Sequence, residues 1–375
     1  MTSLLILSFS PITSDARVLK QVREFTRDYD VTTCGYGPAP EGVVKHIRIP
    51  DDVSIPWADW RLMFLRAYHL SYWRASAVRW VMQTVKKGSF DIILANDVEA
   101  VPVAVKKRPR LGVHADLHEY TPLMHEELPG WRQRRTPYYE WMARFARRAR
   151  SSTTVGKGIA QAYIDNIGIH PEVSTNAAPY AEGTPQPVGD PIRAVYSGAA
   201  LRDRALEETV RGVLDSTSAV TLDLYLMPND PAFIGELRDT AAGSGGRVRV
   251  LDPVPHAKLA ERLRDYDIGI VAVQPRNFNS RWALPNKLFD YVQARLGVIV
   301  GPLPEMEAIL QTYGVGVVTP GFTAADLTKT LNDLTADDVC RMKEASSRSA
   351  HALSAESQVA VWRRAIDAIA ARGMR

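Results

Sequence analysis

The sequence contains few cysteines and no long apolar run. Among its 375 residues only Cys34 and Cys340 are cysteines, and neither has a second Cys or a His at the spacing of a metal site. We therefore expect neither a disulfide framework nor a zinc site, and a reducing compartment. No stretch approaches the roughly 18 to 20 apolar residues that a membrane-spanning helix needs.

The apolar stretch near the N-terminus is too short for a secretion signal. Residues 4–9 follow no basic residue and run into Ser10 and Pro11. We interpret them as a first buried strand. Together these features predict a cytoplasmic protein that is soluble, or peripheral at the inner face of the membrane.

One motif, typical of oxidoreductases, is missing, and a second, the Asp-x-Asp of metal-dependent transferases, has a simpler explanation. The loop at 8–15 contains no Gly-x-Gly-x-x-Gly, which argues against a nicotinamide or flavin oxidoreductase. Asp-x-Asp occurs at 28–30 and 265–267, but both copies directly precede a predicted strand, so we interpret them as helix-to-strand turns. We predict no metal and no cofactor.

The sequence does contain a repeated pattern, an acidic residue followed directly by a β-branched apolar run. Such runs begin at Asp30, Asp91 and Asp267, and each is typical of a buried parallel strand. Helix-length segments alternate with the predicted strands, at 15–27, 98–107, 204–215, 257–264 and 355–371. This alternation predicts the α/β class, with two doubly wound Rossmann-like domains.

The predicted strands form two groups, separated by a Gly/Pro-rich stretch at 182–189. The first group lies near 3–9, 30–35, 43–48, 91–95, 111–115 and 151–155. The second lies near 193–198, 220–226, 247–250, 267–272, 297–300 and 315–318. We predict an N-terminal domain at 1–183, a C-terminal domain at 190–354 and a helix at 355–375 that crosses back to the first domain. Ligands are expected in a cleft between the domains, at the carboxyl ends of the strands.

The segment 284–291, Leu-Pro-Asn-Lys-Leu-Phe-Asp-Tyr, is the best-marked candidate site. Proline favours the first position of a helix, so Lys287 falls in the first turn, where backbone N–H groups and the helix dipole attract phosphate. Asp290 lies one turn on and can accept hydrogen bonds from two ribose hydroxyls. A phosphate clamp followed by a ribose clamp is the chemistry that binds a nucleotide-diphosphate donor. The predicted donor-binding residues here are Pro285, Asn286, Lys287, Leu288 and Asp290. The alternative is an ordinary helix with a good start.

Two strand ends supply further candidates. Gly198 ends the strand at 193–198 and would let the backbone approach a ligand, while Arg202 or Arg204 could bind phosphate oxygens; a simple turn glycine is the alternative. After the strand at 111–115, His118 could bind a sugar hydroxyl or stabilise charge at the transferring carbon. A structural hydrogen-bonding role is the alternative for this histidine.

The chain resembles a GT-B glycosyltransferase of family 4. The matching segments are 10–18, 94–97, 116–119, 176–179, 196–198 and 284–300. The resemblance implies that His118 contacts the donor sugar near the reaction centre and that Arg204 and Lys287 hold the diphosphate. These three form the predicted catalytic group, and we assign Asp15, Asp116 and Glu119 to the acceptor side.

The chain departs from the family pattern at several positions. The family usually carries two glutamates separated by seven residues; the second corresponds to Asp290, but the first corresponds to Trp282. Arg295 and Gly297 stand where a glycine and a proline are common. These departures concern the part of the site that recognises the donor sugar and not the part that grips the nucleotide.

The resemblance implies a retaining, hexosyltransferase-type reaction in which the leaving diphosphate acts as the base. We predict transfer of a sugar from a nucleotide-diphosphate donor to an acceptor hydroxyl, in the synthesis of a glycoconjugate or polysaccharide. The acceptor can be a glycan, a lipid-linked molecule or a small molecule. A sugar-nucleotide epimerase is one alternative. A non-catalytic sugar-nucleotide binding protein, suggested by Trp282, is the other.

The first half also carries basic and aromatic residues. Between Arg132 and Arg150 there are seven arginines and one acid, and an earlier segment bears Trp57, Trp60, Trp73 and Trp80 among arginines. Such segments can lie on an anionic membrane. The alternative is that the aromatics are core residues and the arginines a solvated face. No nucleic-acid reading module is present, and the nucleotide base is expected near 253–256.

Overall fold

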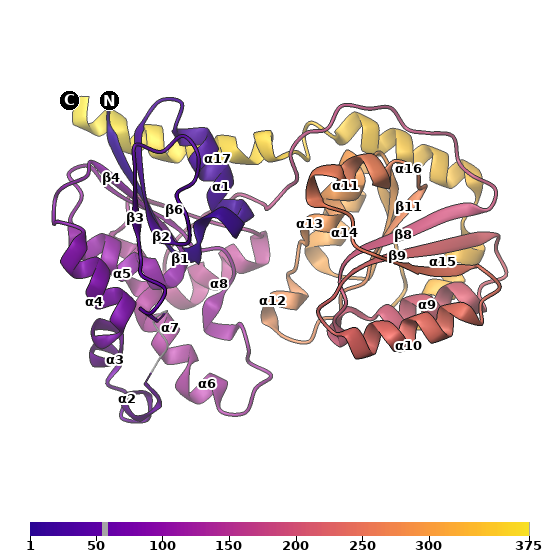
Figure 1. Ribbon diagram of the computed structural model, residues 1–375, viewed down its shortest axis with the longest axis horizontal. Helices are drawn as coiled ribbons and strands as arrows, with labels where there is room; N and C mark the ends of the chain where they lie inside the picture. The colour runs from indigo at the N-terminus through magenta and orange to yellow at the C-terminus, as the bar shows by residue number, and fades with distance from the viewer. Residues whose placement is uncertain (55–58, 375) are drawn as a thin grey trace. The chain divides into compact units, whose positions relative to one another are not determined.

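The computed structural model describes residues 1–54 and 59–374, so Trp57 lies outside the described residues. The chain divides into two α/β units (Figure 1). The first comprises Met1–Thr175, Asn277–Asn279 and Gln358–Arg375, and the second Asn176–Arg276 and Ser280–Ser357.

The first unit is built on a seven-stranded sheet in the order β3-β2-β1-β4-β5-β6-β7. Every pairing in it is parallel. Its strands are β1 (Ser3–Pro11), β2 (Asp30–Tyr36), β3 (Lys45–Arg48), β4 (Ile92–Asn96), β5 (Gly112–Asp116), β6 (Ser151–Thr154) and β7 (Glu172–Val173). The apolar run at the start of the chain forms the inner strand β1, in which Leu4 to Leu7 are fully buried, because both faces of a parallel sheet are covered.

Helices surround this sheet, as Figure 1 shows. They are α1 (Ala16–Phe25), α2 (Trp60–Phe64), α3 (Tyr68–Arg74), α4 (Ser76–Thr84), α5 (Asp97–Lys107), α6 (Trp131–Arg134), α7 (Thr136–Ala143), α8 (Lys157–Ile167) and α17 (Ala355–Ala370), with 3-10 turns η1 (Ile12–Ser14), η2 (Thr121–Leu123), η3 (Arg144–Arg148) and η5 (Ala371–Met374). The basic aromatic segment at 59–84 is thus three short helices.

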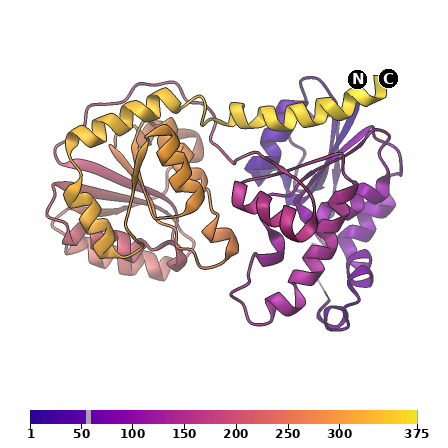
Figure 2. The same cartoon turned by 180° about the vertical axis from the view of Figure 1, so that it is seen from behind.

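The C-terminal helix α17 packs on the first unit, beside α1 (Figure 2). Trp362, Ile366 and Ile369 are buried in the same apolar cluster as Leu4 and Phe25. On its polar side, the Arg363 guanidinium donates to the Glu24 carboxylate at 2.7 Å. The last helix of the chain therefore completes the core formed by the first strands.

The second unit has a six-stranded parallel sheet in the order β10-β9-β8-β11-β12-β13. The strands are β8 (Ile192–Ala199), β9 (Val220–Met227), β10 (Val248–Leu251), β11 (Ile268–Val271), β12 (Gly297–Val300) and β13 (Gly316–Val318). The helices are α9 (Leu206–Asp215), α10 (Pro231–Ala242), α11 (His256–Leu263), α13 (Asn286–Gln293), α14 (Pro304–Tyr313), α15 (Ala324–Asp333) and α16 (Ala336–Ser349), with the 3-10 turn η4 (Arg202–Arg204). The short helix α12 (Phe278–Arg281) straddles the division between the units.

The α/β prediction, with two doubly wound parallel sheets, is confirmed. In both sheets the strand order reverses beside the first strand of the unit, between β1 and β4 and between β8 and β11. Ligands of open α/β sheets bind outside the carboxyl ends of the strands at such a reversal. The topology therefore marks one edge of each sheet as the place for a site.

The chain passes into the second unit after Thr175, earlier than the predicted linker at 182–189. The reason is Arg295, which is 1% exposed. Its guanidinium donates to the carbonyls of Ala181 at 2.7 Å and Gly183 at 3.2 Å, while the Gln293 side chain accepts the Ala181 N–H at 3.1 Å. These bonds hold the start of the Gly/Pro-rich stretch against the second unit.

Candidate functional site

A cavity of about 700 Å³ lies at the carboxyl end of β8 in the second unit. It occupies the edge that the strand reversal marks. Part of its lining consists of residues predicted from the sequence: Gly198, Arg204, Pro285, Asn286, Lys287 and Asp290. The end of β8 and the start of α13 are thus brought together around one space.

Gly198 makes room for Lys287. Its φ is +150°, which side chains rarely tolerate, and a Cβ placed on it would lie 3.0 Å from the Lys287 Nζ. The ammonium rests over the Tyr196 ring, 3.6 Å from the ring centroid, in the geometry of a cation–π contact. A larger residue at 198 would push the lysine out of this position.

The lysine is set up to meet a negative charge. Burial, and then the neighbouring charge of Arg204, lower the pKa of Lys287 to about 7, while Asp290 acts in the opposite direction. Two basic side chains, Lys287 and Arg204, line the cavity beside the first turn of α13, where backbone N–H groups lack intrahelical acceptors. A ligand carrying several negative charges is the natural complement to this end of the cavity.

The position of α13 depends on Tyr291. Its hydroxyl accepts the backbone N–H of Ser197 at 3.1 Å and donates to the carbonyl of Ile270 at 3.4 Å. The Tyr291 ring fills the space above Gly269, where a Cβ would lie 2.1 Å from the nearest ring atom. Helix α13 begins at Asn286. Pro285 is therefore its N-cap residue and not its first helical residue, as was predicted.

The other part of the cavity is apolar and was only partly foreseen. Tyr225, Met227, Val254 and Leu259 line it together with Pro253 and Pro255, in the 253–256 region expected to hold a base. The Tyr225 hydroxyl is hydrogen-bonded to that of Tyr266 at 2.9 Å. Tyr225 and Met227 were not predicted, although both lie at the carboxyl end of β9, beside the end of the strand predicted at 220–226.

Some predicted donor residues do not reach this cavity. The Arg202 guanidinium forms a bidentate pair with Glu236, at 2.9 and 2.6 Å, and lies over the Phe233 ring. The Leu288 side chain is fully buried in the core, and its N–H donates to the carbonyl of Pro285 at 3.1 Å. Trp282 does not line the cavity either. The structure therefore gives Arg202 and Leu288 structural contacts instead of a place at the site.

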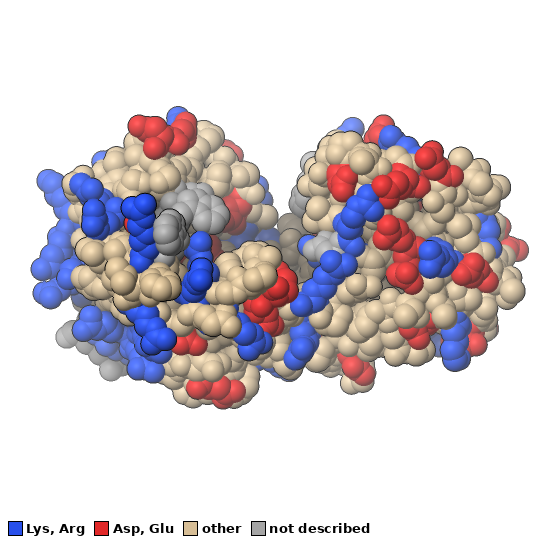
Figure 3. All heavy atoms as spheres, turned by 90° about the horizontal axis from the view of Figure 1, so that it is seen from below, with Lys and Arg blue, Asp and Glu red and all other residues tan. Residues whose placement is uncertain are grey.

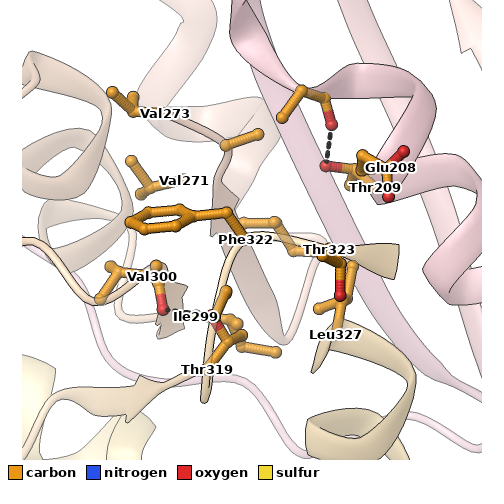
Figure 4. Close-up of a pocket in the computed structure, with 15 residues that line it drawn as sticks. Glu208, Thr209, Val271, Val273, Ile299, Val300, Thr319, Phe322, Thr323 and Leu327 are labelled. Carbon is orange, nitrogen blue, oxygen red and sulfur yellow. Dashed lines mark hydrogen bonds between the residues drawn. The ribbon is translucent and has the colours of Figure 1, made fainter. Parts of the chain in front are cut away.

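A second hollow in the same unit is much smaller, about 50 Å³. Figure 4 shows the Phe322 ring beside Val271 and Val300, with Glu208 and Thr209 across from it. The Thr209 hydroxyl donates to the carbonyl of Ala205 at 2.9 Å. The described residues that line it include no lysine or arginine, and it has room for little more than water, so it does not suit a nucleotide.

In the first unit, the predicted residue His118 is held between carboxylates. Its Nδ1 lies 3.0 Å from Asp97 Oδ1, and its Nε2 lies 3.4 Å from Asp116 Oδ2 and 3.3 Å from Asn96 Oδ1. Asp97 and His118 follow the adjacent strands β4 and β5, and their φ values are +62° and +50°. Non-glycine residues in this conformation are uncommon and cluster at functional sites.

The charges in this cluster reinforce one another. Burial disfavours the charged ring, but Asp97 and Asp116 outweigh it and raise the pKa of His118 to about 10. Burial would also raise the pKa of Asp116, yet Arg17 and His118 hold it well below its usual value. Arg17 donates to both oxygens of Asp116, at 2.8 and 2.7 Å. His118 is therefore an imidazolium at neutral pH, not a proton acceptor.

The remaining acceptor-side residues have mixed positions. Asp116 is fully buried and also accepts bonds from Gln21 and Thr153, at 2.7 and 2.8 Å. Asp15 caps α1 by accepting the N–H groups of Arg17 and Val18, and Glu119 is exposed. Asp97 and Arg17 were not predicted, although Asp97 lies two residues beyond the end of the strand predicted at 91–95.

Two further observations concern the whole described chain. In residues 1–54 and 59–374, no group of three or more His, Cys, Asp or Glu side chains is arranged to hold a metal ion. No helix in the same residues has both the length and the apolar character needed to cross a membrane.

Similarity to known proteins is seen in structure and not in sequence. No protein-family model and no curated protein matches the chain. HepE from Anabaena, solved in complex with UDP, has a TM-score of 0.71 at 13% identity, covering 98% of this chain and 100% of that one. The α,α-trehalose 6-phosphate synthase from Burkholderia multivorans has a TM-score of 0.69 at 12% identity, covering all of both chains.

A third neighbour, the sucrose-phosphate synthase from Thermosynechococcus elongatus, has a TM-score of 0.65 at 12% identity, covering 98% of this chain and 100% of that one. At such identities the likeness concerns the fold. The chain has the GT-B fold, with two Rossmann-like α/β domains, as predicted. Membership of family 4 stays a prediction.

Proposed function

We propose that this protein is a glycosyltransferase that uses a nucleotide-diphosphate sugar as donor. The observation that carries the proposal is the cavity of about 700 Å³, because it combines a cationic end at Lys287 and Arg204 with an apolar end at Tyr225 and Val254. Its volume is within the range of small-molecule sites. A nucleoside diphosphate has the matching division between an anionic and a flat, largely apolar part.

The donor would lie along this cavity in one direction. Its diphosphate would contact Lys287, Arg204 and the first turn of α13, where positive charge is concentrated. Asp290, on the next turn of the same helix, would accept hydrogen bonds from ribose hydroxyls. The base would lie against Tyr225 and Val254, whose apolar surface offers packing and little hydrogen bonding. No metal or cofactor is part of this proposal.

The proposed reaction is a hexosyl transfer with retention of anomeric configuration. The bond between the anomeric carbon and the diphosphate oxygen breaks, and a bond to the acceptor oxygen forms on the same face of the sugar. The acceptor proton passes to the leaving diphosphate. Lys287 and Arg204 would stabilise the charge that develops on that diphosphate. His118, an imidazolium whose two ring nitrogens face Asp97 and Asp116, would supply positive charge and not act as a base.

Thermal unfolding with a ligand panel tests donor binding. UDP and UDP-glucose come first, because HepE has been solved with each; other nucleoside diphosphates and nucleotide-sugars follow, all without added metal and with a chelator present. A ligand that binds only the native state raises the melting temperature. We expect a clear shift with one base, and no shift with any ligand would refute the donor site.

A pair of lysine variants shows whether the shift comes from this cavity. Lys287→Ala should abolish it, because the variant removes a cation at the diphosphate position. Lys329→Ala is the matched control: this lysine is exposed on α15 and pairs with Asp333 at 2.6 Å. Normal donor binding by Lys287→Ala would show that the phosphate assignment is wrong.

Turnover separates the transferase from its competitors. Incubation of the bound donor with a panel of acceptors should release the nucleoside diphosphate and form a glycoside with the donor's anomeric configuration. An epimerase would change the sugar without any acceptor, and a binding protein would leave the donor intact. His118→Ala should lower turnover more than donor affinity, since donor binding is assigned to the second unit.

A further inference from the structure

The short helices α2, α3 and α4 of the first unit carry an excess of positive charge. Residues 60–90 contain six Lys and Arg residues and no Asp or Glu. All six cations are exposed: Arg61, Arg66, Arg74, Arg79, Lys86 and Lys87. Figure 3 shows basic side chains gathered over one face of the first unit. A surface of this kind attracts a polyanion or an anionic membrane.

Large apolar side chains project from the same helices. Phe64 and Leu65 are each 70% exposed and Leu70 is 44% exposed, although Met63 beside them is buried. The turn after α2 explains the difference: Arg66 has a φ of +53°, and the Ala67 N–H donates to the carbonyl of Leu62 at 2.8 Å. This closed turn anchors Met63 inward and leaves Phe64 and Leu65 in water.

A pocket of about 310 Å³ lies between α3, α4 and α5. Its lining combines apolar and basic side chains: His69, Trp73, Arg79, Met82, Gln83 and Lys106. The Lys106 ammonium lies 6.0 Å from the centroid of the Trp73 ring, which packs edge-on against Tyr72 at 4.9 Å. The pocket is therefore held open by a fixed aromatic ring, with two cations and a histidine around it.

We propose that α2, α3 and α4 form a docking surface for an anionic lipid bilayer. Phe64, Leu65 and Leu70 enter the boundary between headgroups and acyl chains, and the surrounding arginines meet lipid phosphates. The pocket at Trp73 receives one phosphate headgroup between Arg79 and Lys106. Two of the three exposed apolar side chains, Leu65 and Leu70, are aliphatic, which favours a bilayer over a nucleic acid, because a nucleic acid would call for aromatic stacking surfaces. This inference does not depend on the donor cavity, which lies wholly in the second unit.

Co-sedimentation of the full chain with vesicles tests the docking surface. We expect binding to vesicles of equal parts phosphatidylcholine and phosphatidylglycerol, weakened by added salt, and little binding to phosphatidylcholine alone. The double variant Arg61→Glu and Phe64→Glu should bind at least about tenfold more weakly, because it removes both an apolar side chain that inserts into the bilayer and a cation that attracts lipid phosphate. The double variant Arg79→Glu and Lys106→Glu should also bind more weakly.

The matched control is Val44→Glu with Lys45→Glu, which changes one exposed apolar residue and one exposed cation elsewhere in the first unit. It should bind anionic vesicles like the unchanged protein, and unchanged melting temperatures will show that all variants fold. Equal loss in the control, equal binding to neutral vesicles or no binding would overturn the proposal. So would tighter binding of a single-stranded oligonucleotide than of vesicles, lost in the same variants.

Discussion

At the residue scale, Lys287 has an unusual protonation state. Burial and Arg204 lower the pKa of Lys287 to about 7. Above that pH the side chain is therefore mostly a neutral amine in the free protein. A bound diphosphate adds negative charge beside it and raises the pKa again. Donor binding should therefore take up a proton.

The uptake can be measured by titration calorimetry in buffers of different ionisation enthalpy. At pH 8 we expect the apparent binding enthalpy to vary with the buffer, corresponding to uptake of up to about one proton per site. At pH 6 the dependence should vanish, because Lys287 is already charged. Lys287→Arg, which is always protonated, is the control and should show no dependence at either pH. Proton release at pH 8 would contradict this assignment.

The second prediction at this scale concerns Asp97, which holds His118 in its charged form. A histidine with a pKa of about 10 instead of 6.5 adds stability that is fully present below about pH 6.5 and is lost as the pH rises towards 10. Asp97→Asn removes the carboxylate 3.0 Å from the ring. The apparent pKa of His118, followed by NMR, should fall by about one to three pH units.

Asp165→Asn is the control, since this carboxylate is exposed on α8 and bonds only the nearby Gln161 among the contacts described. It should leave the His118 titration unchanged. A wild-type ring that titrates near 6.5 would show that the two flanking carboxylates do not hold it charged.

At the scale of an element, the placement of α13 rests on one glycine. A Cβ at Gly269 would lie 2.1 Å from the Tyr291 ring. Gly269→Ala should therefore reduce the free energy of unfolding by about 1 to 3 kcal/mol or more. Donor affinity should fall as well, since Lys287 and Asp290 move with the helix. Urea unfolding and the thermal shift measure the two effects.

Gly235→Ala provides the comparison. Gly235 lies in α10, and among the described residues no atom outside its own stretch of helix would come within 4 Å of an added methyl group. The change should therefore be neutral or stabilise by about 0.5 to 1 kcal/mol. Equal loss of stability in both variants would mean that packing against Tyr291 is not the cause.

Individual elements show what could be predicted from the sequence. The strand at 297–300 has the predicted bounds, because its apolar residues run without interruption between polar turns. Strand β7 was missed, since two residues carry no period. The helix expected at 204–215 begins at Leu206, because Ala205 adopts a φ of +51° that its residue type does not announce. The hydrogen bonds from the Arg295 side chain to the carbonyls of Ala181 and Gly183 join distant parts of the chain, so no local sequence pattern predicts them.

The candidate site was predicted to a similar extent. Lys287, Asn286 and Asp290 lie on one helix, so their spacing alone places them on neighbouring turns. Tyr225 and Asp97 depend on which strands become neighbours, which is a property of the tertiary fold. The side chain of Arg202 was misjudged because its partner Glu236 lies 34 residues away.

At the scale of the whole molecule, the C-terminal helix belongs to the core of the first unit. Trp362 is 2% exposed, and the Arg17 guanidinium lies 4.6 Å from its ring centroid. Trp362→Ala should therefore lower the free energy of unfolding of this unit by about 3 to 5 kcal/mol. Hydrogen exchange should report the loss in the first unit, while donor-induced stabilisation of the second persists.

Arg364→Ala, on the same helix, is the control. Its side chain is 65% exposed and pairs with Glu172 only at 3.8 Å, so the change should cost less than about 1 kcal/mol. Uniform loss of protection in both units after Trp362→Ala would show that they unfold as one.

The segment Asn277–Asn279 belongs to the first unit although both its flanks belong to the second. Asn279 accepts the Tyr120 N–H at 2.9 Å and donates to its carbonyl at 3.2 Å. With the crossings after Thr175 and before Gln358, the chain passes between the units four times. A chimaera that exchanged either half at a single junction would thus separate residues from their own core, and exchange of donor specificity between such proteins would need two grafts, Asn176–Arg276 and Ser280–Ser357, made together.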